Sequence, residues 1–197
     1  MKIVEYRGIE GLVYAPITED TTENFTTGEV KELAGTSELT RTTESSSEVH
    51  YYDNMPAITI ESTGSDEVTC TVSAIPLDIL ADITGQVYDN ATDTFIEGAR
   101  NNKYFALGYK TKKTDGTEVY VWRLKGTFSI PESTHITEDD GTDANGQELT
   151  YTGISTTHKF TKTNKGAKAI NVLADGKANV TDFFKTVQTP DTITAKV

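Results

Sequence analysis

Two stretches near the middle of the chain decide the fold class: residues 103–112, KYFALGYKTK, and residues 117–130, TEVYVWRLKGTFSI. Apolar and polar side chains alternate along both, which is the period of a β-strand with a buried face. Asp115-Gly116, between them, is a typical turn dipeptide, so the two stretches predict a β-hairpin. The second strand has two distinct faces, with Tyr120, Trp122 and Leu124 on one and Val119, Val121 and Arg123 on the other.

The same alternation recurs on both sides of this hairpin. Threonine is frequent and accompanies Val, Ile and Tyr, which suits the pleated, half-buried surface of a sheet. We therefore expect a mainly β protein. The expected strands are 11–15, ending before Pro16, 29–34, 56–62, 67–74 and 147–157, with a turn at Gly64-Ser65-Asp66. The expected loops are 17–28, 87–102 and 138–146.

One segment has the period of a helix. Residues 76–86, PLDILADITGQ, begin with a proline suited to a first helical turn and end near Gly85, a typical C-terminal stop. Leu77, Leu80 and Ala81 fall at helical spacing. We expect them to pack on the sheet that holds Trp122.

A long polar hairpin is predicted in the first third of the chain. Residues 36–53, TSELTRTTESSSEVHYYD, are strand-prone at both ends, and Ser45-Ser46-Ser47 is interpreted as the tip. The segment has too few apolar side chains to be buried, so we expect a projecting assembly element formed by about residues 36–55. Its predicted assembly residues are Glu38, Thr40, Arg41, Thr43, Glu44, Ser46, Glu48, His50 and Tyr52.

The C-terminal part differs in composition. Beyond residue 160 the chain is richer in Lys, Gly and Ala, and residues 179–187 have the pattern of a short helix capped by Asn179 or Thr181. We interpret residues 1–160 as one β domain and residues 161–197 as a C-terminal arm.

Charge and cysteine usage exclude several classes of protein. The formal net charge of -12 argues against a nucleic-acid binder, which usually carries a basic patch. The single Cys70 allows no disulfide framework, and its place in the run Val68-Thr69-Cys70-Thr71-Val72 predicts a buried structural thiol. The N-terminal residues have no apolar signal core, and no stretch has the length of a membrane span. We expect a protein made in the cytoplasm.

Catalytic and metal-binding patterns are absent from the sequence. It has no G-x-S-x-G, H-E-x-x-H, Walker or dinucleotide-binding motif, and His50, His135 and His158 match no metal spacing. The acidic stretch 139–146 fails as a calcium loop, because the first ligand and the bidentate glutamate are missing. Ser45–Ser47 beside Glu44, Glu48 and His50 is better explained as a solvated hairpin than as a nucleophile and base. We expect no enzyme and no cofactor.

The order of these features resembles a known family. GLVYAPITEDT is followed by GEVKELAGTSELT, VHYYDNMPA, the strands ITIE and VTCTVSAIP, the helix PLDILADITG and the hairpin RNNKYFALGYKTKKTDGTEVYVWRLKGTFSIPE. Over about residues 8–160 the sequence resembles the major tail proteins of siphophages, which have long non-contractile tails.

The resemblance implies a fold and an assembly. The fold would be a two-sheet β-sandwich or barrel with one flanking α-helix, the projecting hairpin and the C-terminal arm. Subunits would form hexameric rings that stack into the tail tube of a virion assembled in the host cytoplasm. The implied partners are other copies of the chain, the tape measure protein, and the distal tail and tail terminator proteins. Double-stranded DNA would pass through the tube, and no membrane is involved.

Acidic side chains are candidates for the lumen of such a tube. Glu61 and Glu67 are predicted on the polar faces of two strands joined by a short turn, so both would lie on one wall. There they would repel DNA and let it slide. The alternative is that they only solvate an outer surface. A second hypothesis is a carbohydrate- or host-surface-binding β-sandwich, a decoration or adhesin protein, using Tyr51, Tyr52 and Phe25. A third, a small hydrolase on a β scaffold, lacks a supporting constellation.

Overall fold

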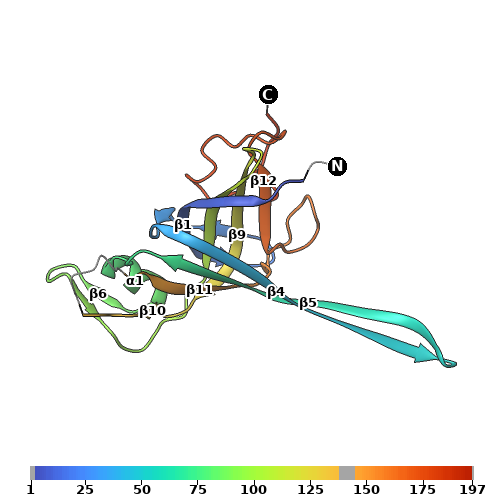
Figure 1. Cartoon of the computed structure of the whole chain (residues 1–197), viewed down its shortest axis with the longest axis horizontal. Helices are drawn as coiled ribbons and strands as arrows, with labels where there is room; N and C mark the ends of the chain where they lie inside the picture. The colour runs from blue at the N-terminus through green and yellow to red at the C-terminus, as the bar shows by residue number, and fades with distance from the viewer. Residues whose placement is uncertain (1–2, 138–144, 197) are drawn as a thin grey trace.

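The computed structural model describes residues 3–137 and 145–196 and is mainly β (Figure 1). The described residues form a ten-stranded antiparallel sheet, a two-stranded sheet and one helix, a β-sandwich-like arrangement that confirms the predicted fold class. The stretch 139–144 of the tested calcium loop lies outside the described residues. The elements are β1 Tyr6–Asp20, β2 Phe25–Thr27, β3 Lys31–Glu32, β4 Thr36–Tyr52, β5 Met55–Val72, α1 Leu77–Thr84, β6 Val87–Asp89, β7 Thr94–Ile96, β8 Phe105–Lys113, β9 Glu118–Phe128, β10 Glu132–Ser133, β11 Gln147–Gly153 and β12 Ala169–Leu173.

The predicted central hairpin is β8–β9, and the large sheet is built outward from it. The strand order is β2-β1-β8-β9-β11-β5-β4, with β3 beside β1, β10 beside β11 and β12 beside β9. Gly116 closes the β8–β9 turn with a φ of 90°, a conformation that glycine adopts without strain. On its other side, β9 pairs with β12 through residues 119–123 and with β11 through residues 126–128.

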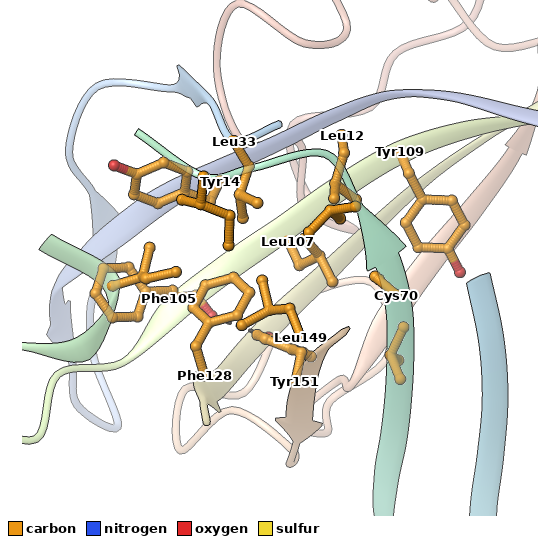
Figure 2. Packing of buried hydrophobic residues seen from close by; sticks show 14 of the residues in the cluster. Leu12, Tyr14, Leu33, Cys70, Phe105, Leu107, Tyr109, Phe128, Leu149 and Tyr151 are labelled. Carbon is orange, nitrogen blue, oxygen red and sulfur yellow. Dashed lines mark hydrogen bonds between the residues drawn. The ribbon is translucent and has the colours of Figure 1, made fainter. Parts of the chain in front are cut away.

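The two faces of β9 enter two separate apolar clusters, as the alternation predicts. The first cluster receives Val119 and Val121. Figure 2 shows this cluster and labels other members of it, among them Tyr14, Phe105 and Tyr151. Because strands as far apart in the order as β1 and β5 both contribute to it, the sheet curls around this cluster. Cys70 is buried here, which confirms the structural thiol, and burial raises the pKa of Cys70 to about 12. The members are Leu12, Tyr14, Leu33, Val68, Cys70, Val72, Ile75, Ile83, Phe105, Leu107, Tyr109, Val119, Val121, Phe128, Leu149 and Tyr151.

The second cluster lies on the opposite face of β9 and is covered by the C-terminal segment. Trp122 is fully buried there, and its indole Nε1 donates a hydrogen bond to the Phe183 carbonyl at 3.0 Å. Phe183 and Val187 pack in the same cluster, and β12 extends the large sheet. Residues 161–196 therefore contribute a strand and apolar side chains to the β domain rather than lying beside it. The short helix expected at 179–187 is wrong, because this stretch forms turns.

The structure confirms the predicted beginning and end of the helix, which is α1. Gly85 follows the helix at a φ of 68°, and a Cβ there would lie 1.9 Å from the Asn101 carbonyl oxygen, so only glycine fits. Leu80 packs on the first cluster, opposite the face that holds Trp122. Leu77 is 48% exposed, so its predicted burial is wrong, because Ile83 and Ala81 fill the buried side of the helix.

Several predicted loops and strand ends are also wrong. Strand β1 is much longer than 11–15 and passes through Pro16. The Ile17 amide bonds the Tyr104 carbonyl, so the missing N–H of Pro16 lies on the side away from β8. Residues 17–28 contain β2 and the end of β1, and residues 87–102 contain the small β6–β7 sheet.

Candidate assembly surface

The projecting hairpin is β4–β5, and it extends far from the body of the protein (Figure 1). Its two strands pair from Thr36↔Val72 to Tyr52↔Met55, so the hairpin spans residues 36–72 and not only 36–55. The turn is Asp53-Asn54, with φ values of 51° and 62°. Two positive φ values are what a tight two-residue hairpin turn requires, and Asp and Asn tolerate them better than most residues.

Two sequence predictions about this hairpin are wrong. Ser45, Ser46 and Ser47 lie in the middle of β4, opposite Thr63, Ser62 and Glu61, and not at a tip. The expected turn at Gly64-Ser65-Asp66 is a β-bulge inside β5, where Gly64 and Ser65 both oppose Glu44.

The bulge changes which face the two candidate lumen residues occupy. The Ser65 hydroxyl donates to the Glu44 carboxylate at 3.0 Å, so the bulged residue and Glu44 share a face. Counting alternation from the bulge, Glu67 lies opposite Thr42 on this face, whereas Glu61 lies opposite Ser47 on the other. The prediction that Glu61 and Glu67 share one wall is therefore wrong.

The predicted assembly residues divide between the two faces of β4. Because β4 has no inserted residue between Glu38 and Tyr52, even-numbered residues lie on one face of the strand and odd-numbered residues on the other. Arg41 and Thr43 turn toward the side of the first cluster, where Thr43 donates to Asp66 at 2.9 Å. The opposite face, called here the outer face, carries Glu38, Thr40, Glu44, Ser46, Glu48, His50 and Tyr52.

The distal part of the outer face carries an apolar stripe beside Glu48 and His50, which sequence reasoning missed. Ile60 lies opposite Glu48, Ile58 opposite His50, and Met55 opposite Tyr52. The four apolar side chains of this stripe, Tyr52, Met55, Ile58 and Ile60, are 61%, 67%, 52% and 54% exposed. A contiguous exposed apolar surface is a usual mark of a protein–protein contact. The signal was present in the alternation of Ile58 and Ile60, but without the register they could not be joined to Tyr52.

The proximal part of the same face is a regular polar wall. The register places Glu38, Thr71 and Glu148 in one row, Thr40, Thr69 and Thr150 in the next, and Thr42, Glu67 and Thr152 in the third. These nine residues, called here the polar wall, are exposed or half-buried. They include three glutamates and neither lysine nor arginine, so the wall presents hydroxyl groups and negative charge.

A buried charge cluster fixes the base of the hairpin. The Asp66 carboxylate accepts a hydrogen bond from the Arg123 guanidinium at 2.6 Å, and the Lys168 ammonium lies 3.4 Å away. Burial opposes ionisation of Asp66, but the hydrogen bond from Thr43 and the charge of Arg123 outweigh it and lower the pKa of the carboxyl. Lys168, directly before β12, also donates to the Gly64 carbonyl, so the bulge is tied to the start of β12.

Other candidate chemistry is not assembled. Within residues 3–137 and 145–196, no group of three or more His, Cys, Asp or Glu side chains is placed to hold a metal ion. The three histidines lie apart on β4, in the exposed segment after β10 and after β11. Of the aromatics proposed for a carbohydrate site, Phe25 packs against Phe160, whereas Tyr51 and Tyr52 are exposed on opposite faces of the hairpin.

No protein-family model matches the chain, and no curated protein matches it. The family resemblance therefore stays a prediction. No helix in the described part of the chain has the length and apolar character of a membrane span.

Proposed function

We propose that this protein is the major tail tube subunit of a siphophage, a structural protein that polymerises as stacked hexameric rings. The observation that carries the proposal is the β4–β5 hairpin, which projects from the core (Figure 1). Its outer face presents an exposed apolar stripe. Such a stripe costs solubility in a free subunit, and burial against another subunit removes that cost.

The polar wall supports the second part of the proposal, a conduit for DNA. Hydroxyl groups and the carboxylates of Glu38, Glu67 and Glu148 cover β4, β5 and β11 without a cation among them. A lumen lined by this wall repels phosphate, so double-stranded DNA passes without binding. Glu67 remains the candidate lumen residue, whereas Glu61 lies farther out on the hairpin, beyond the bulge, and faces the other way.

The proposed partners follow from this role. The subunit assembles with itself, encloses the tape measure protein, and meets the distal tail and tail terminator proteins at the two ends of the tube. Its place is the virion, after assembly in the host cytoplasm. The alternative of a carbohydrate-binding decoration protein has weaker support, because its proposed aromatics do not form one surface.

Sedimentation velocity over a range of protein concentrations tests the proposal. We expect the intact protein to form species of six subunits and their multiples as concentration rises. A variant lacking residues 45–62, with Glu44 joined to Thr63 by Ser-Asn-Gly so that the serine still opposes Thr63 across a two-residue turn, is the matched control and should remain monomeric. A monomer at every concentration for the intact chain would contradict the proposal.

A further inference from the structure

The β4–β5 hairpin becomes narrower where it leaves the body of the protein (Figure 1). Strand β11 pairs with β5 from Val72 to Asp66, whereas β4 pairs with β5 as far as the turn. Residues 45–63, called here the ribbon, are therefore two strands without a third beside them. Neither apolar cluster has a member in the ribbon, so packing against the core does not fix its direction.

The β-bulge lies at the boundary between the sheet and the ribbon. Gly64 and Ser65 both oppose Glu44, and the last pair of β5 with β11 is at Asp66, the next residue. A bulge leaves one residue outside the ladder of strand hydrogen bonds, and the strand bends there. A short irregular segment between two rigid parts has the position and the geometry of a hinge.

The ribbon beyond the bulge is held together by its own contacts. Its strands pair from Ser45↔Thr63 to Tyr52↔Met55, and the hydroxyl groups of Ser46 and Ser62 form a hydrogen bond across it at 2.7 Å. A further register shift lies near the tip, where it redirects only the turn. A change of direction at the bulge therefore moves the ribbon as one body.

One side chain of the body reaches the bulge. The Lys168 ammonium donates a hydrogen bond to the Gly64 carbonyl and lies 3.4 Å from the Asp66 carboxylate. The backbone of Lys168 is fixed to β9, because its carbonyl accepts a hydrogen bond from the Leu124 amide at 2.8 Å. Within residues 3–137 and 145–196, no other side chain outside the hairpin forms a hydrogen bond or an ion pair with residues 44–65.

The hydrogen bond between Lys168 and Gly64 is placed so that it can open. The Lys168 side chain is 24% exposed, so water can replace the Gly64 carbonyl as acceptor. The ammonium keeps the Asp66 carboxylate as its counter-charge in either position, because Asp66 lies on the body side of the bulge. A single hydrogen bond at a partly exposed site favours one direction of the ribbon without excluding others.

We propose that the bulge at Gly64-Ser65 is a hinge about which the ribbon swings, and that Lys168 holds the ribbon in the direction shown in Figure 1. Opening the hinge breaks the contact of Lys168 with Gly64 but leaves the pairs of the ribbon and the Asp66–Arg123 ion pair in place. The motion is a rigid-body swing and not unfolding. It belongs to the single subunit, so it goes beyond the proposed function and does not depend on it.

Distances between two spin labels, measured by double electron–electron resonance in dilute monomeric protein, test the hinge. Thr59→Cys with Thr152→Cys, both at exposed positions, places one label on the ribbon and one on β11. Ser47→Cys with Glu61→Cys places both labels on the ribbon at opposing positions. Cys70 is buried and stays unlabelled. We expect a narrow distance distribution from both pairs when Lys168 is present.

Lys168→Met keeps the apolar stem of the side chain but removes the donor. Arg123 still pairs with Asp66, so the variant should fold. We expect the distribution between ribbon and β11 to widen and the distribution within the ribbon to stay narrow. Lys165→Met, at an exposed position in the same segment, is the matched control and should leave both distributions unchanged.

Deleting Gly64 in the Lys168→Met background tests the place of the hinge. The deletion removes the bulge and leaves Ser65 alone opposite Glu44, so the distribution between ribbon and β11 should become narrow again. An unchanged width in Lys168→Met would overturn the role of Lys168. A wide distribution after the deletion would overturn the hinge at the bulge, and a wide distribution within the ribbon would show unfolding instead of a swing.

Discussion

The charge cluster at the base of the hairpin gives the sharpest prediction for stability. Asp66 and Arg123 have side chains that are 6% and 5% exposed, and their nearest oxygen and nitrogen are 2.6 Å apart. Asp66→Asn keeps the size of the side chain but removes its charge. Arg123 is then a buried cation that has lost its ion-pair partner, and the neighbouring Lys168 carries the same sign.

Removing one partner of a buried ion pair costs about 3–5 kcal/mol of unfolding free energy. For a chain of this size, 1 kcal/mol corresponds to about 2–4 °C, so the melting temperature should fall by roughly 6–20 °C. Urea denaturation followed by tryptophan fluorescence measures the same loss, with an unchanged m-value. Glu67→Gln, one residue away on the exposed wall, is the control and should change stability by less than about 0.5 kcal/mol.

The pH dependence of the unfolding free energy tests the same ion pair. The pKa of Asp66 is lowered in the folded state, so its stabilisation is complete above the unfolded pKa of about 3.9 and is lost as pH falls through the folded value. The difference between the intact protein and Asp66→Asn should therefore be constant from pH 5 to 7, and shrink below about pH 4. A variant that loses less than about 1 kcal/mol at neutral pH would refute the reasoning.

Four further predictions concern other parts of the molecule. Leu80→Asp should lower the unfolding free energy by several kcal/mol, because it places an unpaired charge against the first cluster; an unchanged melting temperature would show that α1 does not pack there. Glu67→Lys should leave tubes intact but make them bind DNA, and this binding should weaken at high salt. Tubes of Glu61→Lys should not bind DNA, and a filter-binding assay measures the difference. The variant lacking residues 45–62 should melt within a few degrees of the intact protein by circular dichroism, because the removed residues contribute nothing to either cluster. Cys70 should resist alkylation at pH 8 in the folded protein and react in urea; rapid modification without urea would contradict its burial and raised pKa.

The parts of the fold that could be predicted are those in which apolar residues recur at the spacing of a strand or a helix. The β8–β9 hairpin has apolar residues at alternate positions and a glycine at its turn, and α1 is bounded by Pro76 and Gly85. In each case the residue pattern and the local geometry require the same structure. The two faces of β9 were also predictable, although the partner of Trp122 was not, because Phe183 lies 61 residues further along the chain.

The long hairpin was predictable in kind but not in register. Ser, Thr and Glu occupy both faces of its middle part. Because apolar and polar residues do not alternate there, the sequence does not show which residues face each other or where the turn lies. Asp53-Asn54 is a dipeptide that tolerates positive φ values, but the three small polar residues Ser45–Ser47 have equally strong turn propensity in the sequence. The bulge at Gly64 then exchanges the faces of β5, which no count of alternate residues detects. As a result the hairpin was identified, whereas the apolar stripe and the polar wall were not.

Negative-stain electron microscopy of the purified protein at high concentration tests the central claim most directly. We predict hollow tubes built from stacked six-fold rings, and none from the variant that lacks residues 45–62. Dispersed single particles from the intact chain, or filaments without a lumen, would contradict the account.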